Sequence, residues 1–137
     1  MKTNNILVLA IMVMTMLACM SAIKKGNIPT RAVIKYVDFE IVTPIHVDRE
    51  SFDKYFSSNI SVLTVEDAHF LDSLNNIIMN LKPSTQGFKP DVRMLIKLFY
   101  PDSSFKVVAL SDIALEVDSS EMIFEPKLIS LVKTKIK

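Results

Sequence analysis

VRMLIKLFYPDSSFKVVAL, residues 92–110, holds two apolar stretches joined by a short polar turn. In the first stretch, 92–100, apolar side chains recur at every second position with basic residues between them, which is typical of a half-buried strand. Pro101-Asp102-Ser103-Ser104 favours a turn, because proline presets the backbone at its own position and Asp and Ser suit the others. The sequence therefore predicts an antiparallel strand pair whose second member is Phe105–Leu110.

Similar alternation occurs on both sides of this pair. From Arg31 to Val47 the odd positions are mostly apolar, and Pro44 ends, bends or divides this strand, since proline cannot donate a hydrogen bond to a neighbouring strand. Ile113–Val117 alternates with acidic residues and predicts a third strand after the pair. Met122–Phe124 predicts a short fourth.

Three stretches predict helices. Asp48 is a suitable N-cap for a short helix, whose apolar face consists of Phe52, Tyr55 and Phe56. A longer helix is expected to begin with Thr64 as N-cap and Asp67 three residues later, and to end before Pro83. Its apolar stripe consists of Phe70, Leu71, Leu74, Ile77, Ile78 and Leu81, and its polar side of Asp72, Ser73, Asn75, Asn76 and Asn80. Pro126 suits the first position of a final helix, whose apolar residues are Leu128, Ile129, Val132 and Ile136.

These elements predict one α+β domain at residues 31–137. The expected fold is a single antiparallel sheet of about four strands with two or three helices packed on one face, because the apolar side of each strand has to be covered. Residues 19–30 contain Gly26 and Pro29 and lack periodicity, so they are expected to be a tether. The chain is long enough for one sizeable core but not for two.

Charge is balanced, with sixteen Lys and Arg against fifteen Asp and Glu, so the composition gives no reason to expect a nucleic acid partner. Cys19 is the only cysteine, which excludes a disulfide within the chain. The sequence contains no recognisable cofactor or metal motif, and no cofactor is expected.

The N-terminus carries the features of an export signal. One lysine precedes thirteen apolar or nearly apolar residues, Ile6–Ala18. This run falls within the roughly 7 to 15 residues of a signal-peptide core and is shorter than the about 20 residues of a membrane-spanning helix.

Met16-Leu17-Ala18-Cys19, at the end of this run, resembles the lipobox of bacterial lipoprotein precursors. The resemblance implies that residues 1–18 are removed as a signal peptide. It also implies that Cys19 receives a diacylglyceryl group on its thiol and an acyl chain, such as palmitate, on its new amino group. The domain would then stand outside the cytoplasm in the bacterial cell envelope, anchored to the membrane by lipid.

Two other interpretations of the leader stay open. The apolar run extends with interruptions to Ile23, so it could be an uncleaved single-pass anchor. Alternatively, an ordinary signal peptidase could cut after Ala22. Lys24 and Lys25 follow closely, and positive charge prefers the cytoplasmic side of a membrane.

An enzymatic site would depend on Asp38, Glu40 and His46. On one strand face the two carboxylates would lie about 7 Å apart, a distance suited to acid and base roles. The surrounding sequence gives no sign of an apolar pocket that would separate their pKa values. The preferred interpretation is therefore the outward face of a sheet.

Other polar groups have structural interpretations. Glu66, His69 and Asp72 share part of one helix side, but a di-metal site would need a second Glu-x-x-His copy from another helix. Three serine pairs stand where turns favour serine, outside any Gly-x-Ser-x-Gly motif. These pairs are Ser57-Ser58, Ser103-Ser104 and Ser119-Ser120.

Two segments could bind a partner. Asp38–Asp72 contains eight acidic and two basic residues and could attract a cationic protein. Phe88 and Phe99-Tyr100, next to prolines, could form an exposed aromatic patch, although packing beneath the loop is the preferred interpretation.

The sequence thus predicts an exported, lipid-anchored binding or interaction protein. Its expected partners are the membrane, through lipidated Cys19, and a protein that the sequence does not identify. One alternative is an inhibitor or immunity-type partner of a secreted toxin, acting through the acidic segment. The other is an enzyme with a site near Asp38, Glu40 and His46.

Overall fold

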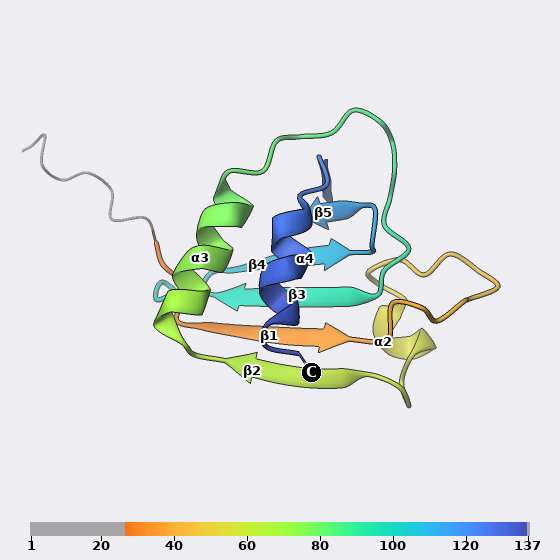
Figure 1. The fold of residues 1–137 in the computed structure, drawn as a ribbon, viewed down its shortest axis with the longest axis horizontal. Coiled ribbons are helices and arrows are strands. Elements are labelled where there is room, and N and C mark those ends of the chain that lie inside the picture. Colours follow the sequence, from red (N-terminus) through yellow and green to blue (C-terminus); the bar gives the residue numbers. More distant parts are fainter. Residues whose placement is uncertain (1–26, 137) are drawn as a thin grey trace, which may run out of the picture.

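A six-stranded antiparallel sheet with the order β2-β1-β3-β4-β5-β6 forms the centre of the computed structural model, which describes residues 27–136 (Figure 1). The strands are β1 (Arg31–Tyr36), β2 (Ser61–Val65), β3 (Met94–Phe99), β4 (Phe105–Leu110), β5 (Leu115–Val117) and β6 (Ser120–Met122). The helices are α2 (Phe52–Tyr55), α3 (Ala68–Met79) and α4 (Pro126–Lys133). The α+β class and the single antiparallel sheet are confirmed, but the sheet has six strands rather than about four.

The main core lies between one face of the sheet and the two longer helices, α3 and α4 (Figure 1). Met94, Ile96 and Leu98 of β3 are fully buried there, as the alternation in this strand predicts. The helices bury the apolar stripes expected from their sequences. Their buried residues are Phe70, Leu71, Leu74 and Ile78 of α3, and Leu128 and Val132 of α4.

The short helix α2 packs on the opposite face of the sheet, which corrects the expectation that all helices lie on one face. Leu95 and Ala109 point away from the main core, because they alternate with the buried residues of β3 and β4. Phe52 and Phe56 pack with them in a second, smaller cluster, and their rings meet edge to face at 5.3 Å.

The strand β2 was not expected, and its presence shifts the start of the long helix. Thr64 lies in β2, where it is paired with Val33 of β1, and is not an N-cap. The N-cap is Asp67, whose Oδ1 accepts a hydrogen bond from the Phe70 N–H at 2.9 Å. Because the residues before Asp67 are largely β-branched, a strand that completes pairing along β1 is favoured there over a helix turn.

The strand expected from Arg31 to Val47 ends at Tyr36. Two residues further on, the Asp38 carboxylate accepts the Glu40 N–H at 3.0 Å, and this local bond turns the chain out of the sheet. Near the C-terminus, Ile113 lies in the turn before β5, and the last strand is Ser120–Met122 instead of Met122–Phe124.

The two edges of the sheet differ. β2 is the outermost strand on one side. On the other side residues 82–84 run beside β6, where the Ser84 N–H donates to the Glu121 carbonyl at 3.0 Å and the Ile123 N–H donates to the Lys82 carbonyl at 2.8 Å. Pro83 forms an isolated bridge with Met122 between these bonds.

The expected signal peptide, residues 1–18, and the lipidation residue Cys19 lie outside the described residues. Within residues 27–136, no helix has the length and apolar character needed to cross a bilayer. Asn27 and Thr30, at the end of the expected tether, are hydrogen-bonded to the hairpin between β3 and β4. The Thr30 N–H donates to the Phe99 carbonyl at 2.8 Å. The Asn27 side-chain amide donates to the Asp102 carboxylate at 3.0 Å.

Candidate functional site

The end of the sheet far from Asn27 collects three loops: residues 37–51, residues 80–93 and the turn between β4 and β5 (Figure 1). The chain arrives there at the end of β1, leaves it at the start of β3 and returns at the end of β4. Polar interactions hold these loops in place, and cavities open between them. The candidate site is therefore built from this end of the molecule.

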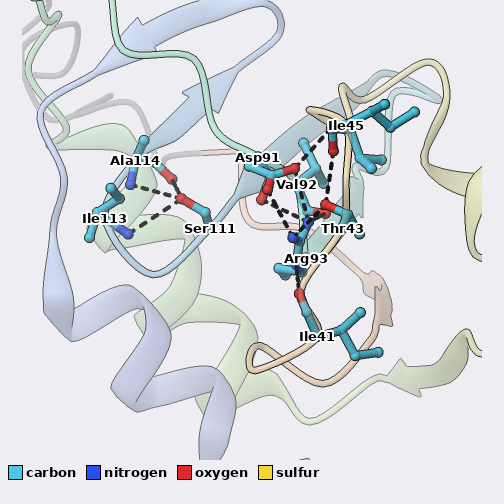
Figure 2. Close-up of polar contacts among 10 residues, drawn as sticks. Ile41, Thr43, Ile45, Asp91, Val92, Arg93, Ser111, Ile113 and Ala114 are labelled. Carbon is cyan, nitrogen blue, oxygen red and sulfur yellow. Dashed lines mark hydrogen bonds and ion pairs between the residues drawn. The ribbon is translucent and has the colours of Figure 1, made fainter.

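Arg93 is the central residue of the loop region. Its side chain is only 7% exposed, and its Nη1 and Nη2 donate to the two Asp91 carboxylate oxygens at 3.0 and 2.8 Å. Its Nε donates to the Ile41 carbonyl at 3.2 Å and its Nη2 to the Thr43 hydroxyl at 3.0 Å (Figure 2). The guanidinium thus ties the 37–47 loop to the start of β3.

Asp91 completes this arrangement. Its carboxylate also accepts the Val47 N–H at 2.8 Å. Partial burial alone would raise the pKa of Asp91, but the hydrogen bonds from Arg93 and Val47 outweigh burial and leave that pKa below its usual value. Both charged groups are therefore committed to holding the loops.

Ser111 fixes the turn between β4 and β5 in a similar way. Its hydroxyl accepts the N–H groups of Ile113 and Ala114 at 3.3 and 3.1 Å (Figure 2). These bonds close the turn, and the Ile113 side chain is left 75% exposed at its tip. An apolar side chain is thus presented on a rigid turn.

A groove runs along the 83–90 loop. It consists of two cavities, of about 300 and about 480 Å³, which share four lining residues: Gln86, Phe88, Ile113 and Ala114. We call these two cavities together the loop groove. Phe88 is 68% exposed beside it, and Ile123, which lines the smaller cavity, is 55% exposed. The loop groove is therefore bordered by three large apolar side chains that face solvent.

Phe88 accordingly contradicts the preferred expectation that the aromatic residues near prolines pack under their loops. Tyr100 agrees with it, since Tyr100 is 8% exposed and its hydroxyl donates to the Asn75 carbonyl oxygen at 2.8 Å. Asn75 was expected on the polar side of its helix but is buried by this contact. Phe99 is the last residue of β3, whereas Phe88 lies in the loop before the strand begins. The two rings are therefore at opposite ends of the sheet and do not form one patch.

The three residues of the possible enzymatic site are exposed and do not share a strand face. Asp38 and Glu40 lie in the turn after β1. His46 lies further along the loop and lines a separate cavity of about 320 Å³ with Arg49, Lys89 and other residues. Hydrogen bonds from the Ser51 hydroxyl and N–H lower the pKa of Asp48, which lines the same cavity.

The cavity beside His46 contains one carboxyl group with a raised pKa. Burial raises the pKa of Glu116, and Glu50 and Glu121 add to this effect, while Arg49 and Lys89 oppose it. Ser119 lines the same cavity. His46, Glu116 and Ser119 line this cavity together, and no hydrogen bond within residues 27–136 joins any two of them.

The remaining candidates occupy the positions expected of structural groups. Glu66, His69 and Asp72 are exposed along α3 and just before it. Within residues 27–136 there is no group of three His, Cys, Asp or Glu residues that could hold a metal ion. The serine pairs lie in turns or at strand ends, and Ser103 and Ser119 adopt positive φ angles of 66° and 70°.

Two residues central to this region, Asp91 and Arg93, were not singled out from the sequence. Arg93 was interpreted as an outward-facing residue of a strand. The spacing Asp-x-Arg was the available signal, because residues two apart in an extended chain point to the same side. The partners Ile41 and Thr43 are about fifty residues away, and the sequence carries no sign of their proximity.

No family model, curated protein or solved structure matches the chain.

Proposed function

We propose that this protein is a lipid-anchored binding protein of the bacterial cell envelope, and that its loop groove holds an apolar segment of a partner protein. One observation carries the proposal of binding: Phe88, Ile113 and Ile123 are more than half exposed around one groove. Contiguous exposed apolar side chains with polar surroundings are typical of protein interaction sites. Rigid turns hold them in place, which lowers the entropy lost on binding.

The chemistry of the loop groove favours binding over catalysis. Asp91 and Arg93, the charged pair that lines its larger cavity, are bound to each other and to the backbone of the 37–47 loop. Asp112 also lines this cavity and is exposed. A general base must be free to accept a proton from a substrate. The Asp91 carboxylate instead holds structural hydrogen bonds and has a lowered pKa.

The proposal of a lipid anchor rests on the lipobox-like Met16–Cys19 and the apolar run before it. One acyl chain gives only marginal membrane binding, whereas two or more hold a protein firmly. A diacylglyceryl group with an N-acyl chain on Cys19 would therefore keep the domain at the membrane. The loop groove, at the opposite end of the sheet from Asn27, would then be free to meet a partner.

Membrane fractionation and mass spectrometry of the mature protein test the anchor. We expect the native chain to begin at Cys19 with the mass of three acyl chains and to partition with membranes. Cys19→Ala should abolish both properties. A mature chain with residues 1–18 attached, or with a free thiol at Cys19, would contradict the anchor.

Site-directed cross-linking tests the groove. A photoreactive side chain in place of Phe88 should give a discrete protein adduct in intact cells, and the same side chain in place of Val62 should not. Val62 is a suitable control because it is 60% exposed on β2, away from the groove. Ile113→Ser should reduce the yield of the Phe88 adduct several-fold. Equal, diffuse labelling from both positions would contradict the proposed groove.

A further inference from the structure

The face of the sheet that carries α2 is only partly covered, and its open half combines aromatic and basic side chains. Cross-strand pairing places Arg31, Phe99 and Phe105 in one row across β1, β3 and β4. It places Val33, Lys97 and Val107 in the next row. Directly paired residues point to the same face, so these six side chains form one surface, which we call the open patch.

The following row is covered. It consists of Lys35, Leu95 and Ala109. Leu95 and Ala109 pack in the cluster around Phe52 and Phe56, and Lys35 forms an ion pair with Asp53 at 2.6 Å. The α2 segment therefore closes the half of this face near the loop groove. It leaves the half near Asn27 open, where Arg31 and Phe105 are exposed and the other four side chains are half-buried.

Cations and aromatic rings alternate within the open patch. The Arg31 guanidinium lies 4.4 Å from the centre of the Phe99 ring. The Lys97 amine lies 5.2 Å from the Phe99 ring centre and 4.1 Å from that of Phe105. Phe105 is 54% exposed. The six positions include two positive charges and no carboxylate.

Two carboxylates, those of Asp118 and Asp102, lie at the border of the open patch. Asp118 accepts the Val107 N–H at 2.8 Å and lies 3.8 Å from the Lys106 amine. Asp102 accepts hydrogen bonds from Ser104 and from the Asn27 amide. The six positions of the patch itself are apolar or cationic, which complements an apolar layer with an anionic border.

The first described residues lie beside this surface. The Thr30 N–H donates to the Phe99 carbonyl, so the polypeptide enters the domain beside the patch. Cys19 and Asn27 lie eight positions apart, with seven residues between them, and a fully extended chain over that distance spans at most about 28 Å. A membrane anchor at Cys19, or an uncleaved anchor ending near it, therefore holds this end of the sheet close to the bilayer.

We propose that the open patch docks the domain onto the anionic phospholipid surface of the membrane to which the chain is anchored. Phe99 and Phe105 would enter the boundary between headgroups and acyl chains, while Arg31 and Lys97 would reach the phosphates. The inference rests on the proposed anchor, and it adds an orientation: the loop groove faces away from the bilayer.

A tryptophan reporter tests the docking, since the chain contains no tryptophan. The lipidated full-length protein with Phe105→Trp is reconstituted in vesicles of phosphatidylcholine and phosphatidylglycerol that contain brominated acyl chains. We expect its fluorescence to be blue-shifted and strongly quenched. Ile113→Trp, at the other end of the sheet, is the matched control and should remain unquenched.

Charge reversal tests the electrostatic part. Each cation near an anionic surface contributes about 1 kcal/mol, so loss of two should lower the ratio of docked to undocked protein about thirtyfold. Arg31→Glu with Lys97→Glu, in the Phe105→Trp background, should therefore abolish the quenching. Lys82→Glu with Lys127→Glu makes the same change in net charge on exposed residues of the 80–93 loop and of α4, which packs on the other face of the sheet, and should preserve it.

A second readout uses the unaltered chain. Acetylation of the Lys97 amine by a water-soluble reagent should slow several-fold when the vesicles contain phosphatidylglycerol, and acetylation of Lys127 should not. Protein that floats with the vesicles but shows equal Lys97 reactivity and an unquenched Phe105→Trp indole would overturn the docking alone. Protein that fails to float with the vesicles would overturn the anchor and the docking together.

Discussion

The Arg93 guanidinium and the Asp91 carboxylate form two parallel hydrogen bonds, from Nη1 at 3.0 Å and from Nη2 at 2.8 Å, between residues two positions apart in the chain. Such a fork is among the stronger pairings available to proteins. Since the same guanidinium also reaches Ile41 and Thr43, one side chain holds the 37–47 loop against the start of β3.

Replacing Arg93 should therefore destabilise the whole domain. Arg93→Met leaves the Ile41 carbonyl without its donor and the Asp91 carboxylate without its cation, with only the Val47 N–H still bound to it, and we expect the free energy of unfolding to fall by about 3 kcal/mol. Arg49→Met is the control, because Arg49 pairs with the exposed Glu50 and should change stability by less than about 1 kcal/mol. Urea unfolding measures both. Equal effects would show that Arg93 does not hold the loop.

The lowered pKa of Asp91 makes part of the stability depend on pH. A carboxyl group whose pKa is lower in the folded state stabilises the protein above its unfolded pKa, near 3.8 for aspartate, and loses that contribution as pH falls through the folded value. Asp91→Asn should therefore reduce the fall in unfolding midpoint below about pH 4. The contribution of the Asp91 charge to the free energy of unfolding should stay under about 1 kcal/mol, because the carboxylate is 40% exposed. An unchanged acid profile would contradict this role.

Glu116 should behave in the opposite way. Burial raises its pKa, so its charged form is disfavoured in the folded state and its effect on stability becomes less favourable as pH rises above about 4.5. Glu116→Gln should therefore raise the thermal midpoint at pH 7 and have little effect at pH 4. Glu40→Gln, at an exposed position in the turn after β1, is the control and should leave the thermal midpoint nearly unchanged at both pH values. A destabilising Glu116→Gln at pH 7 would contradict the prediction.

The buried hydrogen bond between Tyr100 and Asn75 permits a double-mutant test. Asn75→Ala leaves the Tyr100 hydroxyl buried without its partner and should cost about 1 to 3 kcal/mol. Tyr100→Phe combined with Asn75→Ala removes both polar groups and should recover part of that loss. Unfolding free energies of the two single variants and the double variant measure the coupling. Purely additive effects would mean that the bond contributes nothing.

Two turn positions should respond to substitution with opposite signs. Asp118 and Ser119, with φ angles of 48° and 70°, form the two-residue turn between β5 and β6. Ser119→Gly should stabilise the protein by about 0.5 to 1 kcal/mol, because glycine adopts this conformation without strain. Gly87 has a φ of 72° and open space around it, so Gly87→Ala tests strain alone and should destabilise by about 1 kcal/mol. Thermal unfolding that moved in the same direction for both would contradict this assignment.

Local periodicity predicted much of the fold. The alternation in β3 and the stripes of α3 and α4 are determined by neighbours in the sequence, and the structure confirms them. β2 was missed because SVLTV stands directly before a helix cap and matches the entry to a helix as well as a short strand. Its pairing with β1, about thirty residues earlier, decided between these possibilities.

The candidate site was less predictable, because loops from distant segments assemble it. Asp38 and Glu40 were interpreted as part of a strand, but a local hydrogen bond ends β1 before them. The exposure of Phe88 depends on how the 83–90 loop lies beside the turn at Ile113, and the sequence does not encode this relation locally. The open patch arises from strand register, which sets Arg31 opposite Phe99.

The unequal edges of the sheet limit how this domain can polymerise. A neighbouring molecule could extend the sheet beside β2, whereas residues 82–84 block the same process beside β6. Two molecules joined through their β2 strands would therefore present only blocked edges to further molecules. Filament growth by repeated strand addition would therefore stop at a dimer.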